Sequence, residues 1–99
     1  FFMNAATIEL RFELPRVFDM FSVSDVSEEW TQRIRSKPDK VIVNCKNVAC
    51  IDSPAISLLV KFRNQLIKSG CQIELHNVGD NLLHFFSATR LDQYFKIQN

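Results

Sequence analysis

Polar and apolar side chains alternate strictly near the start of the chain. Between Ala6 and Leu14 every second position is apolar (Ile8, Leu10, Phe12 and Leu14), and the residues between them are polar or charged. A repeat of two is typical of a β-strand with one covered face. We therefore predict a strand from Ala6 to Leu14, which Pro15 ends.

A repeat of four follows in the next segment. Val26, Trp30 and Ile34 lie four residues apart between about Asp25 and Arg35, with acidic residues at the start and arginines near the end. This order of charges favours a helix because it complements the helix dipole. Trp30 is expected to belong to the core.

Two shorter strands are predicted further along the chain. The run from Val41 to Val43 is β-branched and does not alternate, which is typical of an interior strand buried on both faces of a parallel sheet. The segment from Cys71 to Asn77 places apolar side chains on one face, at Ile73 and Leu75. Both segments are therefore expected to pair in one sheet.

The longest predicted helix runs from Pro54 to Ser69. Ser53 is suited to cap its start, Pro54 fits a first turn that needs no N–H, and Gly70 suits the left-handed end of a helix. Its apolar side chains cover an arc of about 200°, so part of the arc must face a neighbouring helix or a partner. We expect one edge of the arc to lie outside the deep core; it is formed by Ile56, Val60 and Ile67, near Arg63.

A last helical segment is predicted to begin at Asp80 or Asn81. Its apolar residues are Leu82, Leu83, Phe85 and Phe86. We expect one ring of the Phe85–Phe86 pair in the core and the other to be available for contact. The residues expected to close the core near the end are Leu91, Tyr94, Phe95 and Ile97.

This order of elements predicts an α/β fold. Alternating strands and helices favour a mostly parallel β-sheet of about four strands with helices packed against it, in one small domain covering residues 1–99. Sites in such folds gather beyond the carboxyl ends of the strands. The segment from Val48 to Ser53 is expected to run through that region.

Composition excludes several classes of function. Twelve Lys and Arg against eleven Asp and Glu leave a net charge of +1 and no basic stripe, so nucleic-acid binding is not expected. No apolar run approaches the roughly 20 residues that cross a bilayer, so no membrane insertion is expected. The start lacks the pattern of a secretory signal, and we expect a cytoplasmic protein.

The sequence offers little for catalysis or for a bound metal. The three cysteines (Cys45, Cys50 and Cys71) form no C-x-x-C pair, and we interpret them as buried apolar residues. His76 and His84 lack further ligands nearby, so no metal is predicted. The absence of a G-x-S-x-G motif and of a glycine-rich phosphate loop favours a protein without enzymatic activity and without a cofactor.

Asp52-Ser53-Pro54-Ala55 differs from these segments because it places a hydroxyl at a helix N-terminus near the functional edge of the sheet. From spacing alone, the simplest interpretation is a helix cap. The wider segment from Ile51 to Val60, followed by Lys68 to Leu75, resembles the signature of STAS domains, which are named after sulphate transporters and anti-sigma factor antagonists. Phe18 to Ser22 resembles the Leu-Asp-x-x-Thr loop of this family, Val41 to Asn44 its central strand, and Leu91 to Ile97 its closing segment.

The resemblance implies a phosphorylation-switched binding module. In the anti-sigma factor antagonists that this chain resembles, the serine after the motif aspartate, here Ser53, is phosphorylated by a serine kinase that is also the anti-sigma factor. The unphosphorylated protein binds that kinase and frees a sigma factor, and a PPM-type serine phosphatase restores binding. The resemblance and the adjoining surface imply partner contacts at Asp19, Ser22, Asp52, Ser53, Pro54, Ala55, Ile56 and Val60.

The chain departs from the family pattern at a few positions. Ala55 replaces the usual glycine, Pro54 replaces a small residue, Arg16 replaces the glycine before the loop, and Asn44 stands where many members have aspartate. Only Phe1 to Asn4 precede the first strand, so the opening hairpin of the family is expected to be shortened. The hydroxyl of Ser53 is retained.

Two further hypotheses remain open. In the first, the chain is a STAS subunit or regulatory domain of a transport system, in which the wide apolar arc is a permanent interface and Ser53 is only a helix cap. In the second, it is a small-molecule or nucleotide sensor. The absence of a glycine-rich phosphate loop argues against this second hypothesis. Independently of these hypotheses, the alternative for Asp19 and Ser22 is a simple turn before the first helix. The expected oligomeric state is a monomer or weak dimer.

Overall fold

The centre of the molecule is a parallel sheet of four strands in the order β1-β3-β5-β6. The structure is a computed structural model, and it describes residues 7–99. The four strands are β1 (Glu9–Glu13), β3 (Lys40–Asn44), β5 (Gln72–His76) and β6 (Lys96–Gln98). A separate pair of short parallel strands consists of β2 (Val17–Phe18) and β4 (Cys50–Ile51). The predicted α/β class and the mostly parallel sheet of four strands are confirmed.

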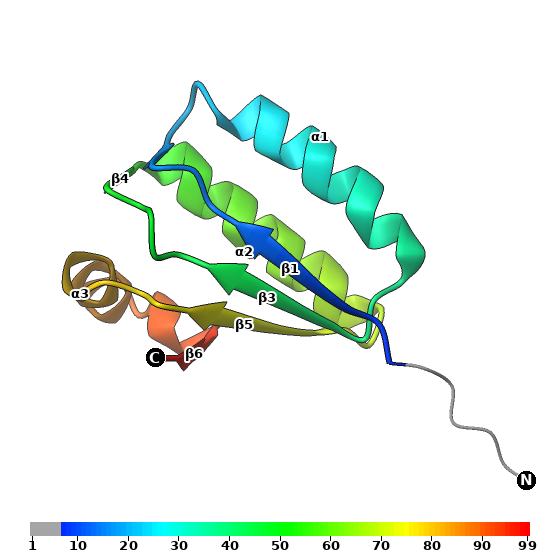
Figure 1. Cartoon of the computed structure of the whole chain (residues 1–99). Helices are drawn as coiled ribbons and strands as arrows, with labels where there is room; N and C mark the ends of the chain where they lie inside the picture. Colours follow the sequence, from blue (N-terminus) through cyan, green and yellow to red (C-terminus); the bar gives the residue numbers. More distant parts are fainter. Residues whose placement is uncertain (1–6) are drawn as a thin grey trace, which may run out of the picture.

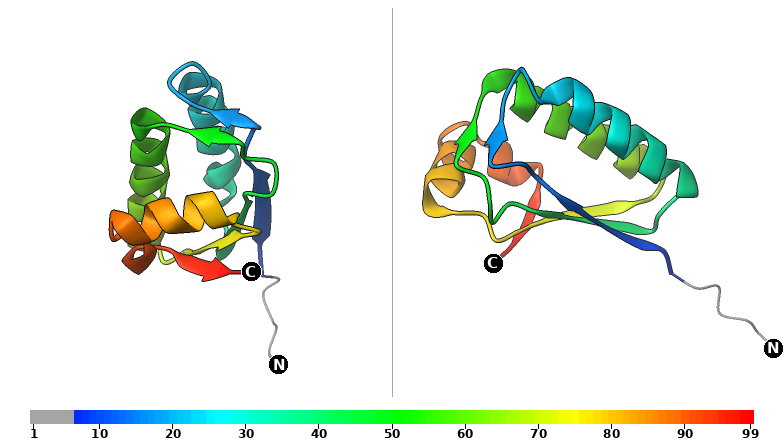
Figure 2. Two further views of the ribbon diagram at one scale, coloured as in Figure 1. Left: turned by 90° about the vertical axis from the view of Figure 1, so that its left-hand side faces the viewer. Right: turned by 45° about the horizontal axis from the view of Figure 1, so that its top comes forward.

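The helices pack over one face of the sheet and at its carboxyl end (Figure 1). They are α1 (Val23–Arg33), which continues into the 3₁₀ turn η1 (Ile34–Ser36), α2 (Ser53–Lys68) and α3 (Asp80–Ala88), followed by the 3₁₀ turn η2 (Leu91–Gln93). Figure 1 shows α1 and α2 side by side over one face of the sheet, and the turned views of Figure 2 agree. The short helix α3 lies at the carboxyl end of the sheet, near β4.

The core lies between the sheet and the pair α1–α2. Trp30 of α1 is 2% exposed, and its ring centroid lies 4.7 Å from that of Phe12 on β1 and 5.2 Å from that of Phe62 on α2. One tryptophan thus joins the edge strand to both helices, and its predicted place in the core is confirmed. Because α1 packs on α2, part of the wide apolar arc of α2 is covered within the molecule.

The end of α2 follows the expected glycine stop. Gly70 has a φ of +83°, which is costly for residues with a Cβ. Its N–H donates to the carbonyl of Ile67 at 3.0 Å, and the N–H of Cys71 donates to that of Leu66 at 2.8 Å. These two bonds form a Schellman motif, which turns the chain directly into β5.

Several element boundaries differ from the sequence predictions. The first strand is shorter than the predicted range and covers Glu9–Glu13, since Thr7 and Ile8 precede it. Ala6 and the Phe1 to Asn4 segment lie outside the described residues. β2, β4 and β6 were not predicted, because two or three residues are too few to show a repeat. Of the residues expected to close the core, Phe95 is buried, but Tyr94 is half exposed.

The face of the sheet that points away from α1 and α2 carries a buried carboxylate. The side chain of Glu74 is 6% exposed, and its Oε1 lies 2.9 Å from Nε2 of His76. Its Oε2 lies 3.0 Å from Nζ of Lys40 and 3.5 Å from Nζ of Lys96. The hydrogen bond with His76, followed by the one with Lys40, lowers the pKa of Glu74 from 4.5 to about 2. This cluster joins β3, β5 and β6.

Candidate functional site

The pairing of β2 with β4 brings two distant segments together. Val17 lies opposite Cys50 and Phe18 opposite Ile51, and the N–H of Asp52 donates to the carbonyl of Phe18 at 3.3 Å. The loop after β2 therefore lies beside the start of α2, at the carboxyl end of the sheet (Figure 1). We call residues 19–22 together with residues 52–55 the Asp52–Ser53 corner.

Asp52 is the N-cap of α2. Its backbone is extended, with φ −121° and ψ 178°, and its Oδ1 accepts a hydrogen bond from the N–H of Ala55 at 3.0 Å. The prediction that Ser53 caps the helix is therefore wrong, since Ser53 is already the first helical residue. A cap needs non-helical backbone so that its side chain reaches the third amide of the helix, and only Asp52 meets this condition here. Pro54 lies in the first turn, as predicted.

The other carboxylate oxygen of Asp52 holds the neighbouring loop. Oδ2 accepts a hydrogen bond from the N–H of Met20 at 2.8 Å. Asp19 and Ser22 fix the same loop from within: Asp19 Oδ1 accepts from the N–H of Phe21 at 3.0 Å, and Ser22 Oγ accepts from the N–H of Asp19 at 3.0 Å. Asp19 and Ser22 thus form the expected turn before α1, and a direct contact of either with a partner stays a prediction.

The tip of this loop carries two exposed apolar side chains that the sequence interpretation missed. Met20 is 61% exposed and Phe21 is 84% exposed. Most apolar residues of the chain follow a helical or strand repeat, whereas these two follow a turn-forming Asp19 and belong to neither. That irregularity was the available signal. We call Met20 and Phe21 the apolar tip.

Only part of the predicted contact surface is accessible. Ser53 and Pro54 are exposed, whereas Ala55 is completely buried. Ile56, predicted to lie outside the deep core, is 7% exposed and belongs to the core cluster, which corrects that prediction. The reason is that α2 is covered by α1 as well as by the sheet. Val60 is half-buried, so the accessible surface of the corner is formed mainly by Ser53, Pro54 and the apolar tip.

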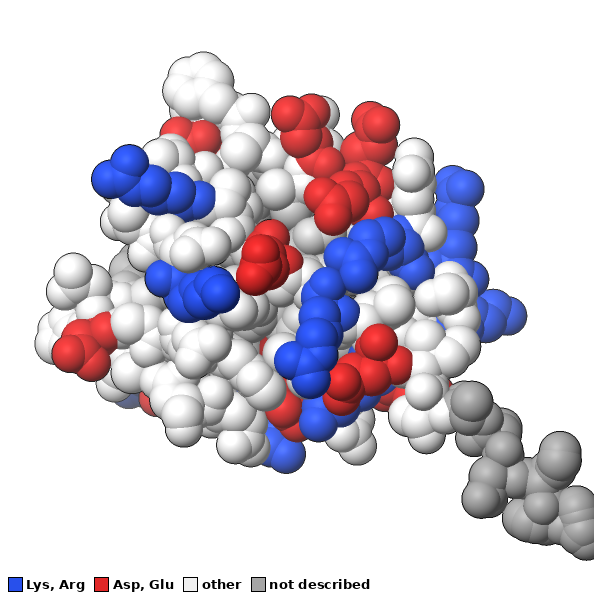
Figure 3. Space-filling model, viewed as in Figure 1, with Lys and Arg blue, Asp and Glu red and all other residues white. Residues whose placement is uncertain are grey.

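The surroundings of the corner are acidic. Residues 17–32 and residues 47–60 contain no Lys or Arg, whereas they contain Asp19, Asp25, Glu28, Glu29 and Asp52. Figure 3 shows acidic side chains gathered over α1, with basic side chains beyond them toward the other end of that helix. Apart from Arg16, which is exposed just before β2, the corner therefore presents carboxylates to a partner.

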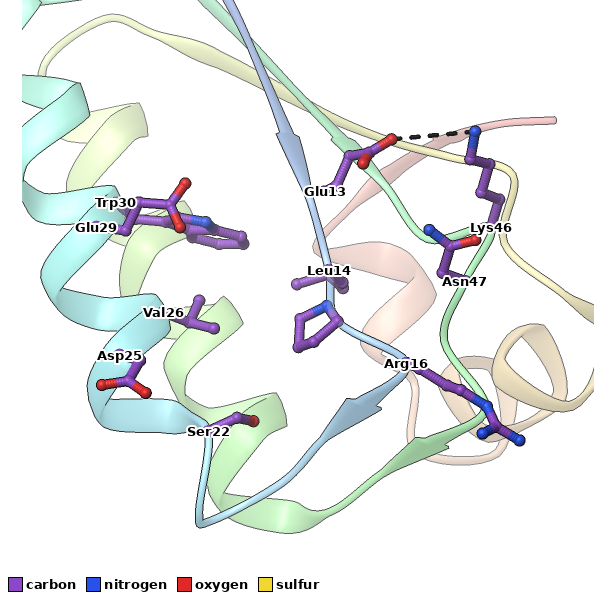
Figure 4. A pocket seen from close by; sticks show the side chains of 11 residues that line it. Glu13, Leu14, Arg16, Ser22, Asp25, Val26, Glu29, Trp30, Lys46 and Asn47 are labelled. Carbon is purple, nitrogen blue, oxygen red and sulfur yellow. Dashed lines mark ion pairs between the residues drawn. The ribbon is translucent and has the colours of Figure 1, made fainter.

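The nearby hollows do not include the serine. A groove of about 810 Å³ lies between α1 and the stretch that follows β1; Ser22 lines it, and the Glu13–Lys46 ion pair, 4.0 Å apart, lies at its far side (Figure 4). A second hollow of about 500 Å³ lies between β4 and the start of α3, and Phe85 is part of its lining. Ser53 lines neither hollow. The side chain of Ser53 therefore lies on the open surface.

The remaining candidate groups do not form a reactive centre. Cys45 and Cys71 are buried, and burial raises the pKa of both thiols, that of Cys45 to about 12. Cys50 is exposed, which corrects the prediction that all three cysteines are buried. Among residues 7–99 there is no cluster of three or more metal-ligating side chains. None of the helices in this part of the chain is long and apolar enough for a membrane span.

Comparison with known proteins is consistent with this geometry. The model of the STAS domain family matches residues 5–99. A STAS-domain containing protein of Pseudomonas aeruginosa (strain UCBPP-PA14) is 25% identical over 89 residues, which are 90% of this chain and 87% of that protein.

Two solved structures share the fold. A sulfate transporter family protein from Wolinella succinogenes is 21% identical, with a TM-score of 0.78 over 90% of this chain and 75% of that one. The anti-sigma factor antagonist SpoIIAA in its unphosphorylated form is 16% identical, with a TM-score of 0.77 over 97% of this chain and 85% of that one. At these identities the two likenesses establish the architecture alone.

Proposed function

This chain belongs to the STAS domain family, and on that premise we propose that it is an anti-sigma factor antagonist whose binding is switched at Ser53. In its unphosphorylated form it binds an anti-sigma factor that is also a serine kinase, and thereby frees a sigma factor. The chain itself catalyses no reaction, and its site residues serve in recognition.

The observation that carries this proposal is the position of Ser53. Its side chain is exposed on the first turn of α2, and the cap of that helix is supplied by Asp52. The hydroxyl is therefore available to the kinase without cost to the fold. In the transfer step, Ser53 Oγ forms a bond to the γ-phosphorus of ATP held by the kinase, ADP leaves, and the hydroxyl proton passes to a base of the kinase.

Phosphorylation changes the surface more than the fold. A phosphate carries a charge of about −1.5 to −2, and a helix N-terminus accommodates an anion. The new charge lies beside Asp52 in an already acidic corner, so an interface that buries it meets repulsion and desolvation. A thousandfold loss of affinity needs only about 4 kcal/mol, which one unpaired buried charge supplies. Hydrolysis of the phosphoserine by a PPM-type phosphatase restores binding.

The test combines mass spectrometry with binding. The protein is purified from its own cells for intact mass and phosphosite mapping, and Ser53→Ala and Ser53→Asp are assayed against a purified serine kinase of the anti-sigma class from the same organism. We expect phosphate on Ser53, tight binding of Ser53→Ala and weak binding of Ser53→Asp. Ser57→Asp, one turn further along the exposed side of α2, is the matched control and should bind like the unaltered protein.

A transport role is the second candidate, favoured by the likeness to the sulfate transporter family protein. In that case the chain is a constitutive scaffold, and Ser53 is only a surface residue. Absence of phosphate from Ser53, equal binding by Ser53→Ala and Ser53→Asp, and stable co-purification with a transporter component would put this function first.

A further inference from the structure

The apolar tip is held in an exposed position by the rest of the corner. An aromatic ring that is 84% exposed loses the free energy of burial, and Phe21 lies beside Met20, which is itself 61% exposed. Three hydrogen bonds nevertheless fix the backbone beneath the two side chains, at the N–H groups of Asp19, Met20 and Phe21. The loop is thus built to present these side chains.

One of these three bonds links the tip to the serine. Asp52 holds the N–H of Met20 with one carboxylate oxygen and the N–H of Ala55 with the other, and it directly precedes Ser53. The same side chain therefore fixes both the start of α2 and the loop that carries Phe21.

The first turn of α2 offers few donors to a phosphate. Pro54 has no N–H, the N–H of Ile56 donates to the carbonyl of Asp52, and the N–H of Ala55 donates to the Asp52 carboxylate. A phosphate on Ser53 consequently competes with Asp52 for the Ala55 amide and repels its carboxylate at the same time. Both effects move Asp52 away from its present position.

We propose that the apolar tip is the anchor of partner binding, and that Asp52 makes its presentation depend on the phosphorylation of Ser53. This inference rests on the proposed function and names the part of the surface that is switched. The partner contributes an apolar socket for Phe21 with a cationic rim, because the corner itself (residues 19–22 and 52–55) contains Asp19 and Asp52 and no Lys or Arg. Phosphorylation displaces Asp52, frees the Met20 amide and loosens the anchor.

The link between serine and tip is tested on the protein alone. Amide hydrogen exchange is measured by NMR on the full chain with phosphoserine incorporated at position 53, and with phosphoserine at the exposed position 57 as the control. We expect the Met20 amide to exchange at least about tenfold faster in the first form and unchanged in the second. The Ala55 amide should stay protected, because the phosphate replaces Asp52 there.

The variant Asp52→Asn separates the two bonds without any phosphate. The single side-chain oxygen of asparagine still accepts the hydrogen bond from the Ala55 N–H. The NH₂ group cannot accept a hydrogen bond, so the bond from the Met20 N–H is lost. Faster exchange at Met20 alone is expected. Unchanged exchange at Met20, either in this variant or with phosphoserine at position 53, would overturn the link.

The anchor is tested by binding to the serine kinase described above. Phe21→Ala should weaken binding at least about 30-fold, whereas Phe85→Ala, which removes an exposed ring from α3, should stay within about threefold. Equal binding by Phe21→Ala and the unaltered protein would refute the anchor. Binding that ignores the state of Ser53 would instead refute the proposed function, and the exchange experiment does not depend on that result.

Discussion

At the scale of single residues, two neighbouring side chains that look equally able to cap a helix have different roles in the structure. Asp52 and Ser53 are both strong helix-capping types, but the extended backbone of Asp52 gives it the cap and leaves Ser53 on the helix. In Glu74, a residue type that is normally exposed is instead buried among cations. In both cases the surroundings decide the role of the residue.

The division between Asp52 and Ser53 predicts different stability effects. Asp52→Ala should lower the free energy of unfolding by about 1–2 kcal/mol, because the cap is lost together with the bond to Met20. Ser53→Ala should change it by less than about 0.5 kcal/mol. Urea denaturation of both variants measures the difference, and equal losses would mean that the capping role is shared.

Glu74 predicts a dependence of stability on acid. Its pKa is lowered in the fold to about 2 from 4.5, so its stabilising effect is complete above pH 4.5 and is lost as the pH falls toward 2. Glu74→Gln should therefore lower the free energy of unfolding by about 1–2 kcal/mol at neutral pH, with a difference from the unaltered protein that shrinks below pH 4.5. Denaturation curves at pH 7, 4.5 and 3 test this, and a constant difference would contradict it.

At the scale of elements, the residues that begin and end α2 also connect this helix to the strands on either side of it. Its start is fixed by Asp52 and its end by the Schellman motif at Gly70, so the length of the helix is set at both ends by local chemistry. The short strands β2 and β4, in contrast, depend on contacts between segments that are distant in the sequence. They pair because the neighbouring elements of the fold bring Val17–Phe18 and Cys50–Ile51 together.

Replacing Gly70, which ends α2, should lower stability through the backbone conformation alone. A Cβ at Gly70 meets no atom within 4 Å, but the φ of +83° disfavours it, so Gly70→Ala should lower the free energy of unfolding by about 1 kcal/mol. Gly79 has an equally open position with a φ of −71°. Gly79→Ala is therefore the control, and thermal denaturation should find a smaller loss, which comes from alanine at the N-cap of α3.

At the scale of the whole molecule, one aromatic cluster holds the layers together. Trp30, the single tryptophan of the chain, lies between Phe12 of the edge strand and Phe62 of α2. Loss of the contact between the helix layer and the sheet would expose this ring. The helices and the sheet are therefore expected to unfold together.

This arrangement predicts a single unfolding transition. In urea, the red shift of Trp30 fluorescence and the loss of far-ultraviolet circular dichroism should have the same midpoint, as expected of a small domain without stable intermediates. A fluorescence change at clearly lower urea would mean that α1 separates from the sheet first.

The sequence predicts the large elements of the fold, but only part of the geometry of the candidate site. The repeat around Trp30, the position of Pro54 in the first turn of α2 and the stop at Gly70 are local signals, and those predictions are confirmed, whereas the cap of α2 is Asp52 and not Ser53. The pairing of β2 with β4, the burial of Ile56 and the exposure of Phe21 depend on contacts between distant segments. A one-dimensional pattern does not encode these contacts at the level of single residues.

The uneven environment of the cysteines has a practical consequence. Cys45 and Cys71 are shielded and hard to ionise, whereas Cys50 is exposed at β4, three positions before Ser53. A thiol-reactive dye at neutral pH will therefore attach selectively to Cys50 of the unaltered protein. The chain thus carries its own attachment point for an optical reporter beside the corner, through which partner docking is followed in real time without engineering the sequence.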